Sequence, residues 1–461
     1  MIPISAALLA AAVLIASPAL SAPKPDPALN AHALEILKRG IAFRTVAGGD
    51  QMVPYAEYLK GVLVAGGYRP DEITIEPMAG TAFLIARYPG KDPKKKLIVI
   101  SGHMDVVEAR PEDWSRDPFT PVIEGGYIYG RGASDNKFDV SVIVATLAKL
   151  RREGWKPGRD VVLALSGDEE TVMATTAVLA ERLKGAEMVL NVDGGGGSII
   201  DDKPAVYGIQ GAEKTYADFE ITITDPGGHS SRPTPTNAIY RLGKALDRLA
   251  AYRFPAMQNE ITKGSMLAAS AGTPGVIGDA LRRYANNPGD TEAMEILSKD
   301  PSQNPGLRTT CVATMIVGGH ATNALPQRAS VTVNCRIFPG TPAANVRETL
   351  VQVIADPSAT VTRMADGSVD SPASPLRPDV IAAVTKAVHA RFPGVPIVPS
   401  QSAGATDSMH FRAVGVPSYG VSGMFTRPGT SFSHGLNEKA PLDTLDGSLA
   451  HHESLLRDLA K

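Results

Sequence analysis

Apolar runs alternate with amphipathic segments along the first half of the chain. Apolar residues at spacings of three and four predict helices at 53–63, 140–150 and 171–183. Short runs of mostly apolar residues predict strands at 82–88, 97–100, 161–165 and 188–192. Strands that are apolar at nearly every position and separated by helices indicate a mostly parallel sheet covered by helices on both faces.

The pattern changes near Gly211. Residues 215–224 alternate between polar and apolar positions, as in a half-exposed strand. A helix, two strands, a helix and a strand are predicted next, at 237–249, 309–317, 329–338, 345–354 and 361–364. This order is that of a ferredoxin-like α+β domain. A long insertion with short helical stretches, residues 254–308, separates its first helix from its second strand.

The first pattern resumes after Gly367 and ends in an amphipathic segment at 442–459. We therefore predict one α/β domain, made of residues 23–211 and 367–461, that is interrupted by the smaller domain at 212–366.

The N-terminus contains an apolar run from Ala6 to Ala16, which is too short to span a bilayer. Small residues follow it up to Ala22. This arrangement predicts a signal peptide over residues 1–22 and a periplasmic or secreted protein with no stable membrane insertion after processing. An uncleaved anchor is the alternative.

The composition argues against some classes of function and some kinds of metal site. Lys and Arg total 46 and Asp and Glu total 48, giving a formal charge of −2. That balance argues against a nucleic-acid binder, which would carry a basic excess. Two cysteines exclude a disulfide scaffold and a cysteine-based zinc cluster, so His, Asp and Glu must hold any metal.

Acidic and histidine residues follow several predicted strands or lie on a Gly-rich loop before a helix. They are His103, Asp105, Asp135, Glu169, Glu170 and Asp193. The carboxyl ends of parallel strands meet at one rim, so we expect these side chains to converge. Clustered carboxylates need cations, and with imidazoles they suit zinc or a similar divalent ion. Each residue alone has a simpler structural explanation, and we interpret His32, His389, His451 and His452 as ordinary surface residues.

Four motifs together carry a resemblance: Ser-Gly-His-Met-Asp-Val-Val, Gly-Arg-Gly-Ala-Ser-Asp-Asn-Lys, Asp-Glu-Glu and His-Gly-Leu-Asn-Glu, at 101–107, 130–137, 168–170 and 434–438. Their order and spacing resemble those of the dinuclear zinc peptidases that include glutamate carboxypeptidase, aminoacylase, carboxypeptidase S and succinyl-diaminopimelate desuccinylase. The resemblance covers nearly the whole chain after the leader. It implies a zinc-exopeptidase-type catalytic domain and a lid domain through which a homodimer can form.

The resemblance implies two Zn²⁺ ions per chain, with Co²⁺ or Mn²⁺ as substitutes. Asp135 would bridge the two ions. His103 and Asp193 would complete the ligands of one ion, and Glu170 and His434 those of the other.

The resemblance also implies three catalytic residues. Asp105 would orient His103, and Glu169 would act as general base on a metal-bridging water. His229, in Gly-Gly-His-Ser-Ser of the lid, would stabilise the oxyanion, in cis or from a partner subunit.

Four further residues match substrate-binding positions of the family. Asn323 and Arg336 would bind the backbone and the C-terminal carboxylate of the substrate, and Gly404 and Thr406 would line its pocket. A surface arginine on a strand is the alternative interpretation of Arg336.

Asp rather than Glu at position 193 is typical of peptidases in this family. We therefore expect an exported metallopeptidase, a carboxypeptidase or dipeptidase, that hydrolyses dipeptides or short peptides near a free C-terminal carboxylate. An N-acyl amino acid amidohydrolase using the same site is the alternative. A non-catalytic periplasmic binder is a third hypothesis, but such a protein would not need Glu169.

Some features depart from the family pattern. Phe138 stands where Gly is common, and four glycines, residues 194–197, follow Asp193. The insertion lies where shorter relatives dimerise, so the oligomeric state stays open. Cys311 and Cys335 lie on consecutive predicted strands, each 12 residues from Asn323. They could face each other as a disulfide or remain two buried thiols.

Overall fold

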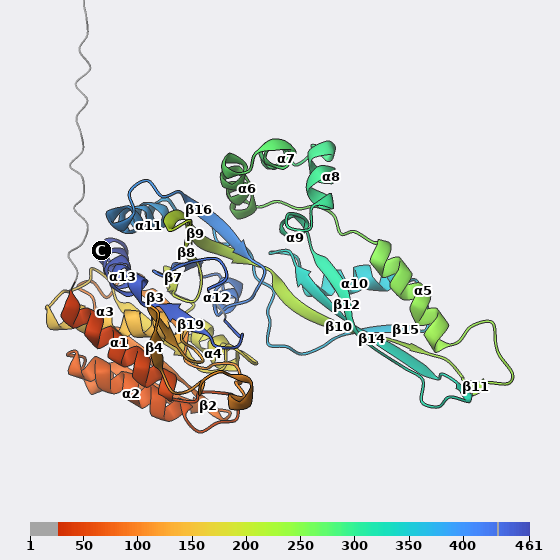
Figure 1. Cartoon of the computed structure of the whole chain (residues 1–461), viewed down its shortest axis with the longest axis horizontal. Helices are drawn as coiled ribbons and strands as arrows, with labels where there is room; N and C mark the ends of the chain where they lie inside the picture. Colours follow the sequence, from red (N-terminus) through yellow and green to blue (C-terminus); the bar gives the residue numbers. More distant parts are fainter. Residues whose placement is uncertain (1–25, 431–432) are drawn as a thin grey trace, which may run out of the picture.

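The computed structural model describes residues 26–430 and 433–461. The predicted leader, residues 1–22, lies outside these described residues. Within them, no helix has both the length and the apolarity needed to cross a bilayer. Figure 1 shows a rounded body that contains the larger sheet and an elongated arm that contains a smaller one.

The centre of the larger sheet consists of parallel strands: β6 (Val161–Ser166), β3 (Ile98–His103), β7 (Met188–Asn191) and β17 (Ser418–Gly420). Ile98 and Ile100 of β3 pack into the core on one face of the sheet, whereas Val99 packs into the core on the other face. Burial on both faces explains why these strands are apolar at nearly every position. The predicted mostly parallel α/β fold is therefore confirmed.

Antiparallel and short strands extend this centre on both sides. One side carries β2 (Thr81–Tyr88) and β1 (Ile73–Met78). The other side carries β9 (Lys203–Glu213), β8 (Gly196–Ile200), β18 (Phe425–Thr426) and β16 (Ile397–Ser402). Sequence reasoning missed β8 and β16 because they are partly exposed and show neither alternation nor a continuous apolar run.

Helices cover both faces of this sheet. One face is covered by α1 (Pro27–Ala42), α2 (Met52–Ala65), α3 (Lys137–Arg152), α11 (Pro378–Arg391) and α13 (Leu445–Leu459). The other face carries α4 (Ala174–Arg182) and α12 (Ser408–Ala413). His451 and His452 of α13 are only 4% and 3% exposed, so their interpretation as surface residues is wrong. They face the packed side of α13 because this helix lies against α3 and α11.

The arm has the ferredoxin-like order predicted from sequence: β10 (Thr215–Thr224), α5 (Ala238–Ala251), β12 (Thr310–Gly318), β14 (Arg328–Ile337), α10 (Ala343–Ile354) and β15 (Ala359–Arg363). The strands lie in the order β12-β14-β10-β15, and both helices pack on one face. Cys311 and Cys335 are register partners on β12 and β14 and form a disulfide, which settles the alternative left open above. The predicted domain boundaries stay a prediction. We refer to this arm as the lid.

The insertion forms a small helical cluster with its own core: α6 (Glu260–Gly272), α7 (Gly275–Asn286), α8 (Thr291–Lys299) and α9 (Asn304–Leu307). Helix α6 packs on β16, where Gly264 lies so close to Pro399 that a Cβ would meet its ring at 2.5 Å. The insertion thus rests against the end of the larger sheet rather than extending the lid sheet (Figure 1).

The remaining elements are short. A two-stranded sheet, β11 (Gly228–His229) with β13 (Ala324–Leu325), lies at the far end of the lid (Figure 1). A three-stranded sheet joins β19 (Lys439–Pro441), β5 (Tyr127–Tyr129) and β4 (Val122–Glu124). Three turns of 3₁₀-helix lie at Pro70–Glu72, Pro111–Asp113 and Leu442–Thr444.

Candidate active site

The predicted metal-binding residues meet at one rim of the larger sheet. His103 ends β3, the pair Glu169 and Glu170 follows β6, and Asp193 follows β7. Because β6, β3 and β7 are adjacent and parallel, their carboxyl ends lie side by side. Asp135 joins them from the Gly-rich turn before α3.

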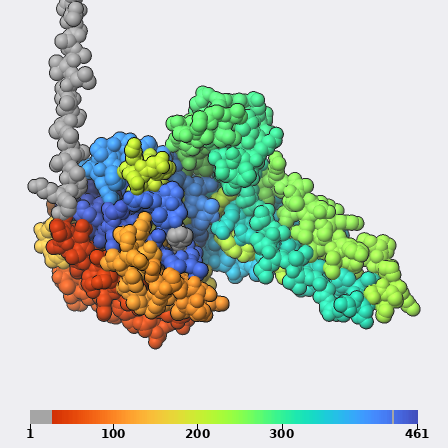
Figure 2. Space-filling model, in the orientation of Figure 1, coloured from red at the N-terminus to blue at the C-terminus, as the bar shows by residue number. Residues whose placement is uncertain are grey.

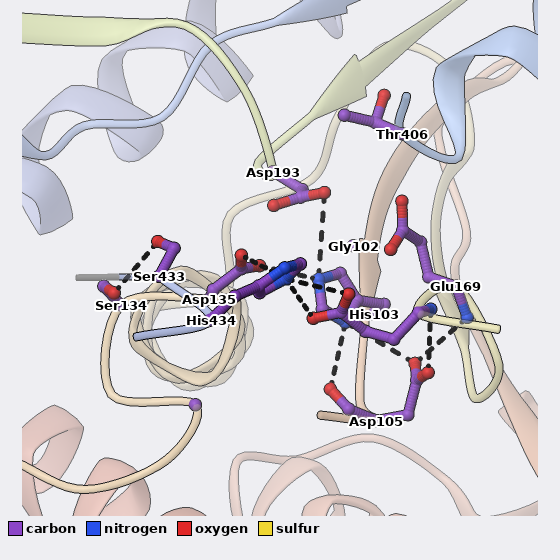
Figure 3. Close-up of polar contacts among 12 residues, drawn as sticks. Gly102, His103, Asp105, Ser134, Asp135, Glu169, Asp193, Thr406, Ser433 and His434 are labelled. Atoms are coloured by element: carbon purple, nitrogen blue, oxygen red, sulfur yellow. Dashed lines mark hydrogen bonds and ion pairs between the residues drawn. The ribbon is translucent and has the colours of Figure 1, made fainter. Parts of the chain in front are cut away.

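The first donor group consists of His103, Asp135 and Asp193. The Nε2 atom of His103 lies 3.1 Å from Oδ1 of Asp135 and 3.8 Å from Oδ2 of Asp193. Figure 3 shows these side chains pointing toward one another. Their donor atoms all lie within 4.8 Å of one another, a spacing that suits one ion between them.

The second donor group consists of Asp135, Glu170 and His434. The Nε2 atom of His434 lies 2.9 Å from Oε2 of Glu170 and 3.4 Å from Oδ2 of Asp135. Asp135 therefore offers one oxygen to each group, which is the arrangement expected of a bridging carboxylate. His434 comes from the loop before β19, which is distant in sequence from the other donors.

The electrostatics of the site favour added positive charge. Burial raises the pKa of Asp193 well above its usual value and also raises the pKa of Glu170. Hydrogen bonds with Asp135 and Glu170 raise the pKa of His434 to about 10. Burial opposes protonation of His103, but the surrounding carboxylates outweigh it and raise its pKa. Imidazoles and carboxylates that attract positive charge this strongly fit a pair of divalent cations.

Asp105 does more than the resemblance implies. Its backbone carbonyl accepts a hydrogen bond from Nδ1 of His103 at 3.1 Å, which leaves Nε2 as the donor atom for a metal. Its carboxylate accepts hydrogen bonds from the backbone N–H groups of Glu169 and Glu170, at 3.1 and 3.0 Å. Asp105 therefore positions both the ligand histidine and the turn that carries the two glutamates.

Glu169 lies beside this centre and is 7% exposed. Burial raises its pKa well above the usual value, and His103 opposes that effect. A carboxylate with raised affinity for a proton, next to two metal donor groups, is placed to take a proton from water.

Other buried residues that support the site were not singled out from the sequence. Glu438 accepts hydrogen bonds from the backbone N–H groups of Gly132, Ser134 and Asp135, at 2.8–3.0 Å, and pairs with Arg131. It thereby holds the turn that presents Asp135. Its place in the His-Gly-Leu-Asn-Glu motif is the sequence signal that could have identified it.

Asn191 and Asp407 provide similar support from behind the strand ends. The Asn191 side chain accepts a hydrogen bond from the Asp193 N–H at 2.8 Å. The Asp407 carboxylate accepts one from Ser166 Oγ at 2.7 Å, at the end of β6. Burial raises the pKa of Asp407 to about 6.

Arg336 and Gly404 lie where the lid meets the rounded body. Arg336 donates to the carbonyl of Ala403 at 2.9 Å and lies over the Tyr216 ring at 4.7 Å. The described part of the chain places no carboxylate within ion-pair distance of Arg336. Its charge is thus available to a ligand.

The Thr406 side chain has structural contacts, and its place in the substrate pocket stays a prediction. It is buried, and its hydroxyl donates to Glu213 at 3.0 Å and accepts from Asn191 at 3.2 Å. Both hydrogen bonds are internal, so the hydroxyl holds the 404–407 loop in place beside the centre (Figure 3).

The structure does not bring His229 and Asn323 to the centre. Both are exposed and lie at the tip of the lid, where the Asn323 carbonyl accepts from the Ser230 N–H at 3.0 Å. The lid tip is the far end of the arm in Figures 1 and 2. Within one chain, these two residues are therefore separated from the metal donor groups.

Two donor groups that share an aspartate, at the rim of this fold, form a candidate dinuclear metal site. The chain belongs to peptidase family M20/M25/M40, whose model matches residues 99–458.

The chain is 32% identical over 280 residues to mouse N-fatty-acyl-amino acid synthase/hydrolase PM20D1, which covers 58% of this chain and 54% of that protein. It is 28% identical over 273 residues to carboxypeptidase S of Saccharomyces cerevisiae, covering 55% and 47%. The matched region spans about half the length of these relatives.

Among solved structures, the chain resembles an M20 family metallo-carboxypeptidase from Sulfolobus solfataricus, with a TM-score of 0.71 and 20% identity, over 93% of this chain and 99% of that one. The di-peptidase Dug1p from Saccharomyces cerevisiae matches with a TM-score of 0.64 and 16% identity, over 94% and 96%. At these identities the likeness demonstrates a shared fold.

Proposed function

We propose that the protein is a zinc-dependent exopeptidase that hydrolyses the amide bond of dipeptides or short peptides next to a free C-terminal carboxylate. The observation that carries this proposal is the shared Asp135 between two donor groups, with buried Glu169 beside them. Imidazole and carboxylate donors suit zinc, and Co²⁺ or Mn²⁺ would bind the same donors.

The chemistry follows from these positions. Two bound metal ions would supply a water of lowered pKa and polarise the substrate carbonyl. Glu169 accepts the proton of that water as its oxygen adds to the carbonyl carbon. Glu169 then passes the proton to the leaving nitrogen when the C–N bond breaks. Asp105 holds the Glu169 turn throughout through the Glu169 and Glu170 N–H groups.

We assign Arg336 to the selection of the peptide bond that is cleaved. Its guanidinium lacks an acidic partner in the described residues and lies beside the Ala403–Gly404 turn. A C-terminal carboxylate would pair with it through charge-assisted hydrogen bonds. This favours cleavage at the terminal peptide bond.

We further propose that the active form is a homodimer in which the lid of a second copy supplies His229 and Asn323. The edge strand β12 of the lid carries the exposed apolar side chains Val312, Met315, Ile316 and Val317, at 57–67% exposure. An exposed apolar edge strand favours pairing with another chain. In such a dimer, the exposed His229 of one chain would act at the donor groups of the other chain.

Export to the periplasm or the medium is part of the same proposal. It is motivated by the apolar run and small residues before position 23. The Cys311–Cys335 disulfide supports it, because disulfides persist in oxidising compartments.

Hydrolysis of N-acyl amino acids is the second candidate function. The observation that favours it is the similarity to proteins named N-fatty-acyl-amino acid synthase/hydrolase. This reaction would use the same two donor groups, together with Glu169 and Arg336, because its product is again a free amino acid.

A substrate screen tests the proposal. Zinc-loaded protein would be incubated with dipeptides and with N-acyl amino acids that share the same C-terminal residue, and the released amino acid would be quantified. We expect faster release from the dipeptides. Faster release from N-acyl amino acids would favour the second function, and release from neither would contradict both. A chelator-treated sample serves as the control.

A further inference from the structure

A cavity of about 180 Å³ lies directly beside the metal donor groups. Asp135 and Asp193 form part of its wall, and the mechanism above makes no use of it. Its other lining residues include Asp139 and Ser422, together with three members of the 194–197 glycine run. The cavity therefore continues the active site on its Asp193 side.

The glycine run allows two chain segments to cross closely beside this cavity. A Cβ on Gly195, which has φ +74°, would lie 2.3 Å from the carbonyl oxygen of Gly420. A Cβ on Gly197 would lie 2.1 Å from the ring of Phe425. Only glycine permits this close crossing of two chain segments. The cavity wall beside Asp193 therefore includes backbone from Gly194, Gly195 and Gly197.

Asp139 is the charged group of this cavity that the metal donor groups do not use. It is 3% exposed and accepts a hydrogen bond from Ser422 Oγ at 2.9 Å. Among the described residues, the basic side chain within ion-pair distance of Asp139 is His452, whose Nε2 lies 3.9 Å from Oδ1 of Asp139. Burial lowers the pKa of His452 to about 4, so this imidazole is neutral at pH 7. Asp139 thus has no cationic partner in the part of the chain that the structure describes.

A buried carboxyl without a cation is costly to ionise, and burial raises the pKa of Asp139 to about 8. Two divalent ions would balance the charges of Asp135, Glu169, Glu170 and Asp193. Asp139 would then remain as the one unbalanced acid of the cavity. A ligand that enters the cavity with a positive charge would complement it.

The geometry of a dipeptide brings such a charge to this place. Its α-ammonium nitrogen lies two bonds, about 2.5 Å, from the carbon that is attacked. Asp139 lies in the first turn of α3, and it lines the same cavity as Asp135 and Asp193. An ammonium group in this cavity can therefore lie within hydrogen-bond distance of the Asp139 carboxylate, about 2.8 Å, while the attacked carbon lies at the donor groups.

We propose that this cavity is the subsite for the N-terminal residue of the substrate and that Asp139 binds its free α-ammonium group. This inference rests on the function proposed above and narrows it to free dipeptides with a small first residue. An apolar acyl chain in the same cavity would offer the buried Asp139 carboxyl neither a charge nor a hydrogen bond. Long-chain N-acyl amino acids are therefore poor substrates.

Two matched substrates test this. Glycyl-leucine and propionyl-leucine have nearly the same shape, but only the first carries an ammonium group. We expect the wild-type enzyme to turn over glycyl-leucine with a kcat/KM at least about tenfold higher, the scale of a charge-assisted hydrogen bond. Equal rates, or a preference for propionyl-leucine, overturn the assignment whatever the variants do. Turnover of neither substrate contradicts the proposed function itself.

Asp139→Asn removes the group that can ionise beside an ammonium ion and keeps the size. We expect it to lower kcat/KM for glycyl-leucine by about tenfold or more and to change propionyl-leucine by less than about twofold. Asp247→Asn, on the exposed side of α5 in the lid, is the matched control and should change neither. An equal loss on both substrates would assign Asp139 a structural role and overturn the proposal.

A binding measurement keeps the test independent of turnover and of folding effects. In the Glu169→Gln background, calorimetry would compare the affinities for the two ligands with and without Asp139→Asn. We expect the additional substitution to weaken glycyl-leucine alone. If Asp139→Asn fails to fold, Ser422→Ala, which removes the one side-chain donor to Asp139, should reduce the preference between the two ligands. An unchanged preference would contradict the assignment.

Discussion

The metal centre and the lid tip present two opposite ways of holding functional residues. At the centre, His103, Glu169 and Asp193 sit on the ends of buried strands and are fixed by hydrogen bonds from their neighbours. At the tip, His229 and Asn323 lie on a two-stranded sheet with exposed side chains. The centre is preorganised within one chain, whereas the tip becomes useful only when something else approaches it.

This difference indicates how substitutions in the two regions should differ in their effects on activity. A change at the centre alters chemistry in a site that is otherwise complete, because its supports come from the same sheet. A change at the tip acts only if the tip of one chain reaches the centre of another. The following predictions test that division, beginning with the largest expected effect.

Replacing the proposed general base should cause the largest loss. Glu169→Gln keeps the size of the side chain but cannot accept a proton. We expect turnover to fall by about 100-fold or more, the usual scale for general acid–base catalysis. Metal content should stay near two ions per chain, because the proposed ligands are untouched. Steady-state kinetics and elemental analysis of the same samples would check both points.

Glu170→Gln is the control for this prediction. It replaces an anionic donor of the second group with a neutral one, so metal content should fall together with activity. The reverse pattern would show that the two glutamates have exchanged roles. Full activity in Glu169→Gln would remove the general-base assignment.

The centre was far more predictable from sequence than its supports. His103, Glu170 and Asp193 could be predicted because each directly follows an apolar strand and because parallel strands end at a common rim. The role of Glu438 was not predicted, since its partners Gly132, Ser134 and Asp135 lie about 300 residues earlier in the chain. The His-Gly-Leu-Asn-Glu motif marks Glu438 as a candidate, but it does not report which distant residues Glu438 contacts.

The errors have equally specific causes. His452 was interpreted as a surface residue, because polar residues on an amphipathic helix are usually exposed. It is buried because α13 packs against α3, and the fold places Asp139 next to it. Strands β8 and β16 were missed because their sequences show neither alternation nor a continuous apolar run. Periodicity cannot report features that only tertiary packing creates.

The next prediction concerns the lid tip. His229→Ala should lower kcat by about 100-fold, the usual effect of removing one oxyanion donor. The metal content and the fold of the exposed tip should not change. Activity equal to that of the wild type would exclude His229 from catalysis.

Mixing two inactive variants tests whether the tip acts in trans. In a mixed dimer, a chain with His229→Ala keeps Glu169 and receives His229 from a partner with Glu169→Gln. Random exchange between equal amounts should restore up to about a quarter of wild-type activity in a closed two-fold dimer. No restoration, with mixed dimers confirmed by native mass spectrometry, would show that the tip serves its own chain.

Arg336 should have an intermediate effect, since it lies between the two regions. Arg336→Ala should weaken kcat/KM for a dipeptide by about 1.5–3 kcal/mol, the scale of a lost charge-assisted hydrogen bond. An amidated dipeptide should be a poor substrate for the wild type, and the variant should make it no worse. Arg328→Ala, at the other end of β14 and paired with Glu220, is the matched control. Equal rates for acid and amide would place the carboxylate elsewhere.

The Cys311–Cys335 disulfide should have the smallest effect on activity, although it lies in the lid core. It joins two strands across a separation of 24 residues, so its loss should lower the free energy of unfolding of the lid by about 3 kcal/mol. The metal donors come from a different sheet with its own core, so kcat/KM in the absence of denaturant should change by less than about twofold. A double Cys→Ala variant, followed by urea unfolding and by activity at each urea concentration, would measure both quantities. A large loss of activity before any unfolding would show that the centre depends on the shape of the lid, and would abolish the division between the two regions.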